Sequence, residues 1–144
     1  MIEYPAKFDD DNAEGGFVVT FPDFPEVLTQ GESQDEAKAM ARDSLRMAIA
    51  YRIEHTEPVP APSKRKGNNF RLVGLPAIHD AKLALYQLWQ ASGMRKVELA
   101  RRLGIPPPNV DRYFRFGRST QVGQLEAAFA ALGKRLVIGV EDAA

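Results

Sequence analysis

The stretch FVVTFPDFPEVLTQGESQDE (Phe17–Glu36) decides the fold of the first half of the chain. Its first five residues, 17–21, are rich in β-branched and aromatic side chains, which predicts a strand that the two following prolines end. The segment 27–30 predicts another strand. Ser33 then begins a helix, because its hydroxyl caps exposed backbone donors and Glu36 reaches back from the third helical position. The stretch therefore predicts two strands followed by a capped helix.

The segments that flank this stretch extend the pattern. Tyr4–Phe8 alternates loosely and predicts a first strand, and residues 9–16 are rich in Asp, Asn and Gly, which predicts a turn. After Ser33, small and apolar residues recur at helical spacing and predict one stripe that faces the sheet, with the helix ending near Glu54. The stripe consists of Ala37, Ala41, Leu45, Ala48 and Ile49.

A Pro-rich and then basic segment, residues 58–69, follows the helix and predicts an extended surface connection. Phe70–Val73 predicts a fourth strand that returns to the same sheet. The sequence thus predicts an α+β protein, whose first domain, residues 1–75, is a small layer of β-β-β-α-β order.

The second half, residues 76–144, has the pattern of an all-α domain with a terminal strand. A first apolar stripe, closed by Gly93, predicts one helix: Ile78, Ala81, Leu85, Leu88 and Trp89. Three more helices are predicted over Arg95–Leu103, Asn109–Phe116 and Val122–Leu132, and Lys134–Val140 predicts the terminal strand. The edge of that strand would be unpaired in a monomer, so we expect a homodimer or homotetramer in which two copies pair.

Composition and charge exclude several classes of protein. The chain has 144 residues, 44% of them hydrophobic, and no cysteine, which excludes disulfides and thiolate metal sites. No apolar run is long enough for a membrane helix and the start of the chain is no secretory signal, so we expect a cytoplasmic protein without a membrane partner. Residues 1–60 carry a net charge of −8 and residues 61–144 carry +8. This asymmetry indicates two surfaces with different partners.

Candidate catalytic or metal-binding groups are few. The acid-rich run Asp9–Asp11 with Glu14, Asp23 and Glu26 offers oxygen ligands, but it lacks the spacing of a calcium loop and favours a solvated turn. His55 and His79 have no second ligand at metal spacing. We therefore expect no catalytic residues, no metal and no cofactor, with a nuclease that uses the early carboxylates as the alternative from a different class.

The segment Lys96–Arg115 has the pattern of a helix-turn-helix, with Ala100, Gly104 and Val110 where that motif needs small and buried residues; a generic helical hairpin is the alternative. The segment 95–118 has seven basic residues and two acidic ones, which favours contacts with DNA phosphates. We assign phosphate contacts to Arg95, Lys96 and Arg118 and base contacts to Arg112, Asn109 and Arg115, with Asn109 as an alternative helix cap. Pro107 and Pro108 start the second helix and offer only apolar contacts, such as a thymine methyl.

Several motifs of the first half resemble the HicB family of type II antitoxins: Gly16-Phe17, Phe21-Pro-Asp-Phe-Pro25, Thr29-Gln-Gly-Glu-Ser33 and Glu36-Ala37. The Lys96–Arg115 segment and the Ala-Leu-Gly-Lys-Arg-Leu run resemble the branch with a C-terminal DNA-binding domain. The resemblance implies a partial RNase H-like sheet without catalysis, a HicA-type RNA-cleaving toxin as partner, and operator DNA as a second partner, which would associate the protein with the nucleoid. We expect toxin contacts around Phe17, Asp23, Phe24 and Glu26. A stand-alone transcriptional regulator with a ligand-sensing or oligomerisation domain is the alternative.

Overall fold

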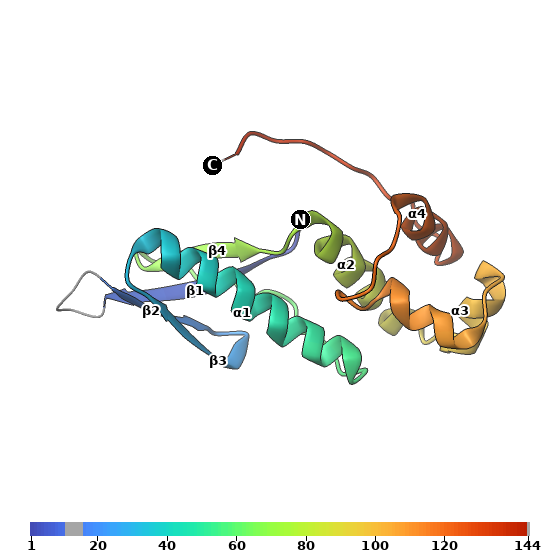
Figure 1. The fold of residues 1–144 in the computed structure, drawn as a ribbon, viewed down its shortest axis with the longest axis horizontal. Coiled ribbons are helices and arrows are strands. Elements are labelled where there is room, and N and C mark those ends of the chain that lie inside the picture. Colours follow the sequence, from blue (N-terminus) through green and yellow to red (C-terminus); the bar gives the residue numbers. More distant parts are fainter. Residues whose placement is uncertain (11–15, 144) are drawn as a thin grey trace. The chain divides into compact units, whose positions relative to one another are not determined.

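The structure, a computed structural model, describes residues 1–10 and 16–143 of the chain, and most of the turn predicted over residues 9–16 lies outside them. The chain divides into two compact units, Met1–Asp80 (unit 1) and Ala81–Ala144 (unit 2). Figure 1 shows a strand-containing unit and a helical unit joined within one helix, α2 (Ala77–Ser92).

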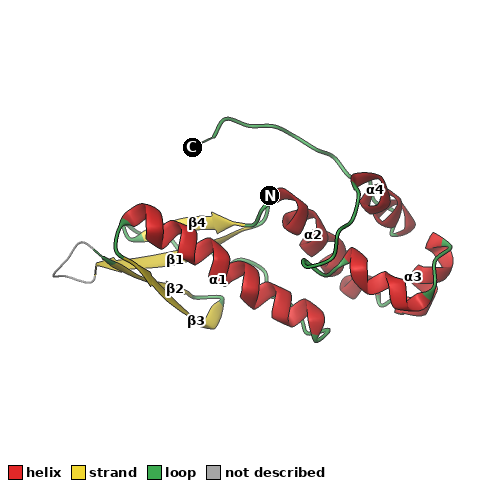
Figure 2. Ribbon diagram, in the orientation of Figure 1, coloured by secondary structure: helices red, strands yellow, loops and turns green. Residues whose placement is uncertain are grey.

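Unit 1 is a four-stranded antiparallel sheet with one long helix on it (Figure 2). The strands are β1 (Glu3–Asp10), β2 (Phe17–Phe21), β3 (Phe24–Gly31) and β4 (Phe70–Gly74), and the helix is α1 (Gln34–Glu54). The order in the chain confirms the predicted β-β-β-α-β pattern. In space the strands lie in the order β3-β2-β1-β4, so β3 and β4 are the edges. The relation to RNase H-like folds stays a prediction.

The prediction that both prolines lie between strands is wrong for Pro25. Pro22 and Asp23 form the tight turn, and β3 begins directly after it at Phe24, which pairs with Phe21 across the hairpin. A proline has no N–H for a ladder, but β3 is an edge strand and one of its sides has no neighbour to receive such a bond. Pro25 is therefore compatible with this strand, although it would disrupt a central one.

The core of unit 1 lies between the sheet and α1. The predicted stripe is buried at Ala37, Ala41, Leu45 and Ile49, with Ile53 in addition, whereas Ala48 is only half-buried. The helix starts as predicted, because Ser33 Oγ accepts from the Glu36 N–H at 3.1 Å, although the Glu36 carboxylate accepts from the Glu32 N–H instead. Gly31 lets α1 approach β3 closely, since a Cβ at that position would lie 2.4 Å from the Ala37 nitrogen.

Unit 2 consists of helices and irregular segments. The rest of α2 is followed by α3 (Lys96–Leu103), a 3-10 helix η1 (Pro107–Tyr113) and α4 (Val122–Ala131). The predicted stripe on α2 is buried at Leu85 and Trp89, but Ile78 is exposed and Lys82 is buried. The rest of the core is apolar and joins all four elements: Leu83, Tyr86, Leu99, Ala100, Val110, Tyr113, Phe114, Leu125, Ala128 and Phe129.

The predicted terminal strand is absent from the described part of the chain, where residues 134–143 form no ladder. Its apolar side chains Val137, Ile138 and Val140 are largely exposed. A β-prone sequence becomes a strand only beside another strand, and the described elements of unit 2 are all helical. The strand prediction is therefore wrong for the single chain. Separately, among the described residues no helix has both the length and the apolarity needed to cross a membrane.

Candidate functional sites

The first site is the arrangement of α3, a turn and η1 in unit 2. α3 ends at Gly104, whose φ of 66° is left-handed, and the Ile105 N–H donates back to the Ala100 carbonyl at 3.0 Å. A glycine takes this conformation without steric cost. Ala100 and Val110 are fully buried where the two helices meet. The close crossing predicted from the sequence is thus present, with a 3-10 helix as the second element.

The second element is Pro107–Tyr113: it begins with the two prolines that were expected at the helix start, and it ends earlier than the predicted range Asn109–Phe116. Its first two residues are prolines, which suit a helix start because the N–H groups of the first helical residues have no partner within the helix. The position before it is Pro106, so the alternative role of Asn109 as the helix cap is wrong. In a 3-10 helix side chains three residues apart eclipse each other. Asn109 and Arg112 therefore lie along one line of η1.

Lys82 is the functional group that the sequence did not predict. Only 1% of this lysine is exposed, and its ammonium donates to the backbone carbonyls of Arg112, Arg115 and Arg118 at 3.0, 2.7 and 2.5 Å. The Thr120 hydroxyl also donates to the Arg112 carbonyl, at 3.0 Å. Burial lowers the pKa of Lys82, and the positive charges of Arg112 and Arg118 lower it further. One buried cation thus fixes the backbone of the basic segment 112–118.

A signal for Lys82 was available in the sequence. Lys82 follows Ile78 by four residues and precedes Leu85 by three and Trp89 by seven, so it lies on the face of α2 that the apolar stripe occupies. A lysine there is either a surface residue at the rim of the stripe or a buried cation with partners. Lys82 is the buried cation because backbone carbonyls 30 or more positions away accept its hydrogen bonds, and the local sequence does not reveal these partners.

The predicted phosphate-contacting cations differ in their surroundings. Arg95 lies at the N-cap of α3 and Arg118 lies after η1, and both are exposed. Lys96 instead forms an ion pair with Asp111 at 2.7 Å and lies 5.6 Å from the centre of the Trp89 ring. The ion pair between Lys96 and Asp111 thus joins α3 to η1.

The residues predicted to contact bases are exposed to different degrees. Pro107, Pro108 and Asn109 are exposed, while Arg112 and Arg115 are half-buried. The Nε of Arg112 is buried without a hydrogen-bond partner, and the Arg115 guanidinium lies 3.9 Å from the Asp111 carboxylate. These five residues come from one short segment and form, with Arg95 and Arg118, the candidate DNA-binding surface.

Glu98 on α3 organises two arginines that sequence analysis did not assign. Its carboxylate accepts hydrogen bonds from Arg101 and Arg102, and these bonds lower the pKa of Glu98 to about 2. Arg102 also donates to the Ala131 carbonyl of α4 at 3.0 Å. Arg102 therefore joins α3 to α4, whereas Arg101 is paired only within α3. Because Glu98 pairs with both arginines, we do not include them in the candidate DNA-binding surface.

The second site is the acidic surface predicted in unit 1, and the structure revises it. Phe24 is fully buried, 4.9 Å from the Tyr4 ring between centres, with the Arg52 guanidinium above it. A residue without exposed surface cannot contact a partner in this structure, so Phe24 is a core residue. Phe17 is half-buried, and the Asp23 carboxylate accepts two hydrogen bonds from Ser63.

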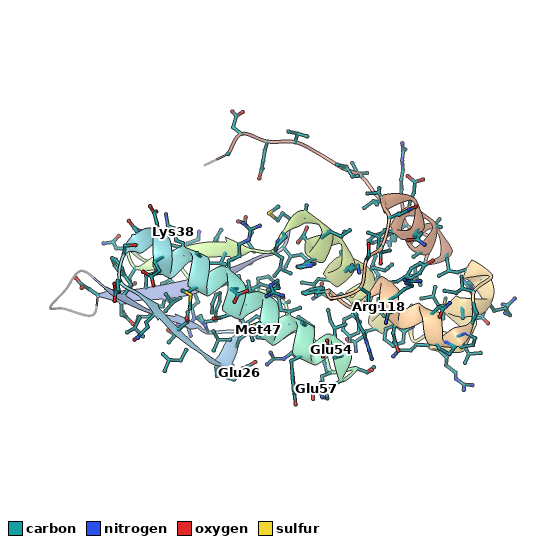
Figure 3. The ribbon with its side chains drawn as sticks, viewed as in Figure 1. Glu26, Lys38, Met47, Glu54, Glu57 and Arg118 are labelled. Atoms are coloured by element: carbon teal, nitrogen blue, oxygen red, sulfur yellow. The ribbon has the colours of Figure 1, made fainter. Side chains whose placement is uncertain are left out.

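Glu26 remains exposed and forms an ion pair with Arg52, which ties the start of β3 to the end of α1. Burial acts to raise the pKa of Glu26, but the hydrogen bond and charge of Arg52 outweigh it and hold that pKa below its ordinary value. Figure 3 shows Glu54 and Glu57 at the same end of α1, and Met47 on the exposed side of that helix. We call Glu26, Glu54, Glu57 and the exposed apolar side chains Met47 and Tyr51 the acidic end of unit 1.

Within residues 1–10 and 16–143, no three histidine or acidic side chains are grouped so that they could hold a metal ion. Two members of the acid-rich run, Asp11 and Glu14, lie outside the described residues.

The fold and the two sites define a protein with a small α+β unit and a basic helical unit. Comparison with known proteins gives the family: residues 3–84 match the family described as "HicB_like antitoxin of bacterial toxin-antitoxin system". Antitoxin HicB 2 of Photorhabdus laumondii is 39% identical over 135 residues, which are 94% of each chain. Antitoxin HicB of Escherichia coli K12 is 36% identical over 85% of this chain and 88% of its own length. The chain belongs to the HicB-like antitoxin family of bacterial toxin–antitoxin systems.

A crystal structure of the Burkholderia pseudomallei antitoxin HicB is also similar. It is 26% identical and aligns over 53% of this chain and 63% of that chain, with a TM-score of 0.46.

Proposed function

We propose that this antitoxin neutralises a small, basic, HicA-type RNA-cleaving toxin through unit 1 and represses its own operon by binding operator DNA through unit 2. The observation that carries the proposal is the division of charge between the units. Unit 1 has nine Lys and Arg against fourteen Asp and Glu, a net charge of −5, and unit 2 has ten against five, a net charge of +5. An acidic surface attracts a basic RNA-binding protein, and a basic surface attracts DNA.

In unit 2, Arg95 and Arg118 supply the exposed charges for phosphate contacts, and Lys82 holds the backbone that carries Arg118. Asn109 and Arg112 lie along one line of η1 and are the candidates for base contacts, adenine for Asn109 and guanine for Arg112. The buried, unpartnered Nε shows that Arg112 satisfies only part of its hydrogen-bonding capacity within the chain. This supports a role for the rest of its guanidinium in binding DNA.

Pairing of two copies through the exposed tail, residues 136–140, would place two such surfaces on one palindromic operator. The exposed side chains of Val137, Ile138 and Val140 support this homodimer, because a β-prone segment without a neighbour offers an unpaired backbone. Binding to the operator would place the protein in the cytoplasm, at the nucleoid.

In unit 1, the acidic end offers three carboxylates beside exposed apolar side chains. Interfaces commonly combine an apolar centre with a charged rim that steers association. A basic toxin would contact Met47 and Tyr51 and place its own cations against Glu26 and Glu54.

The variant Glu54→Lys tests the toxin contact. Glu54 lies in the last turn of α1, where a lysine interacts favourably with the helix dipole, so we expect unit 1 to keep or gain about 0.3–1 kcal/mol of stability. Binding to the small basic protein encoded by the neighbouring gene should weaken at least tenfold in calorimetry. Co-expression of the variant with that protein should no longer rescue growth from its toxicity. The matched control Asp43→Lys makes the same charge change about three turns away and should bind normally. Equal binding by all three proteins would contradict the proposed surface.

The variants Arg112→Ala and Arg118→Ala test the DNA contact. Arg112→Ala should cost about 1–3 kcal/mol of binding to the operator and relax one base position. Arg118→Ala should weaken specific and random DNA alike and reduce the salt dependence by about one ion. Normal toxin binding by both variants serves as the control. If neither variant changes DNA affinity, the assignment of DNA binding to this surface is wrong.

A further inference from the structure

A hollow of about 390 Å³ lies in unit 1, on the face of the sheet opposite α1. Pro5 and Leu72 pair across β1 and β4 and so share this face, and Phe70 lies two residues before Leu72 on the same side. The buried side chains that face α1, such as Tyr4 and Val73, alternate with them. The hollow therefore has an apolar floor on the uncovered face of the sheet.

The connection between α1 and β4 forms the wall of the hollow, with Ser63, Lys64, Arg65, Lys66 and Gly67 lining it. This connection is fixed to the sheet on both sides of its basic residues. The Tyr4 hydroxyl donates to the Pro60 carbonyl at 2.7 Å, and Ser63 donates twice to Asp23. After the basic residues, the Phe8 N–H donates to the Asn69 carbonyl at 2.8 Å. The connection is thus a docked segment that presents its cations at a defined place.

Four cations surround the hollow: Lys64, Arg65, Lys66 and Arg71. They are exposed, and they are four of the nine Lys and Arg of a unit that is otherwise strongly acidic. Arg71 donates to the carbonyls of Asn68 and Phe70 at 2.9 and 3.0 Å, so its guanidinium is held in place. A fixed guanidinium beside two or three ammonium or guanidinium groups binds phosphate well.

The floor adds a second kind of contact. The Phe70 ring is half-buried, and 63% of Leu72 is exposed beside it. Gly67 has a φ of 153°, a conformation that residues other than glycine rarely adopt, and it lies beside the Phe70 ring. An aromatic ring and an aliphatic side chain at the bottom of a basic hollow suit the flat face of a nucleobase.

We propose that this hollow binds one nucleotide unit, with the phosphate on the cations of the wall and Arg71 and the base on Phe70 and Leu72. The ligand is a free nucleotide or a nucleotide of a single RNA strand. Bases of a duplex are stacked inside it and cannot reach the floor, whereas an unpaired base can. An acidic peptide would use the cations but has no flat ring for the floor. The site lies in unit 1 and is separate from the DNA contact proposed for unit 2.

The experiment uses the full chain and measures fluorescence anisotropy of labelled ten-nucleotide oligoadenylate and oligouridylate, over a range of salt concentrations. The double variant Lys64→Gln, Lys66→Gln should bind at least tenfold more weakly, with a salt slope smaller by about 1.4, because each neutralised phosphate of a single strand contributes about 0.7. Phe70→Leu should weaken binding about tenfold with an unchanged salt slope, since it removes stacking and no charge. The matched control Lys38→Gln, Arg42→Gln removes two exposed cations of α1 and should bind normally.

Competition identifies the source of the nucleotide. Displacement of the oligonucleotide by AMP or ADP indicates a free nucleotide, and displacement only by RNA strands indicates a strand; either result supports the site. The proposal is overturned if the hollow variants bind like the control pair. It is also overturned if Phe70→Leu has no effect, or if oligoglutamate displaces the RNA as well as RNA itself does, since either result shows a charged patch without a base site.

Discussion

Replacing Lys82 by methionine tests how the basic segment of unit 2 is held. Methionine keeps much of the side-chain volume and removes the ammonium that donates to the carbonyls of Arg112, Arg115 and Arg118. Hydrogen bonds to a charged group contribute about 1.5–3 kcal/mol each, so three are worth roughly 4.5–9 kcal/mol before other effects. Removing the buried charge also removes a desolvation cost of several kcal/mol. We expect a net loss of about 2–4 kcal/mol in the free energy of unfolding.

The three carbonyls do not all lose their last hydrogen bond in Lys82→Met. The Arg112 carbonyl still accepts from the Thr120 hydroxyl, and the Arg115 carbonyl still accepts from the Arg118 N–H at 3.3 Å. The Arg118 carbonyl therefore depends most on Lys82, and the backbone around Arg118 should lose its fixed position first.

Urea unfolding followed by circular dichroism gives the stability, and anisotropy with a duplex from directly upstream of the coding sequence gives the DNA affinity. We expect Lys82→Met to bind this duplex at least tenfold more weakly, with a salt slope lower by about one to two. The control Leu83→Ala removes a fully buried side chain of the same helix and should cost a similar or larger 2–5 kcal/mol, yet it should bind DNA normally where it is folded. Folded Lys82→Met that binds like the wild type would refute this role of Lys82, and so would Leu83→Ala that loses as much affinity.

Three further predictions concern the rest of the fold. Burial raises the pKa of Tyr4 to about 12, and the charge of Asp23 adds to the effect. The tyrosine therefore keeps its proton to a higher pH in the folded state than in the unfolded chain, so the free energy of unfolding should fall as pH rises from about 10 to 12. Urea unfolding measures this loss, and Tyr4→Phe should abolish it. Gly104→Ala should cost about 1–2 kcal/mol, because only its left-handed φ is strained, whereas Gly117→Ala should be nearly neutral in the same assay. Ile138→Asp should shift sedimentation towards the monomer if the exposed tail pairs two copies, and an unchanged oligomer would exclude that pairing.

Much of the fold of unit 1 could be predicted, because its elements are encoded by local signals. The Ser33 cap and the spacing of Ala37, Ala41 and Leu45 depend on neighbours within one or two helical turns. The position of Pro25 inside a strand depends instead on which strand lies at the edge, and no local pattern determines that order. The tail 134–140 shows the same limit, since a strand requires a partner that its own sequence cannot supply.

The candidate sites were less predictable, because the role of each residue was assigned from its position in the sequence, without its neighbours in the fold. Lys96 has the sequence context of a phosphate-contacting residue, but Asp111 lies within 2.7 Å of it in the fold. Phe24 stands in the motif that resembles the antitoxin family, yet it is buried beneath Arg52. In both cases the deciding contact comes from a residue at least 15 positions away.

One buried lysine and three arginines form a single hydrogen-bonded cluster in unit 2. Arg112, Arg115 and Arg118 are three residues apart, and the carbonyl of each accepts a hydrogen bond from Lys82, so the backbone of three cationic residues converges on a fourth cation. Burial is the largest cause of the lowered pKa of Lys82, and repulsion by the charges of Arg112 and Arg118 lowers it further. A polyanion placed across the arginines would offset the repulsion. DNA binding should therefore raise the pKa of Lys82 and stabilise unit 2 beyond what the same contacts would achieve on a segment without a buried cation.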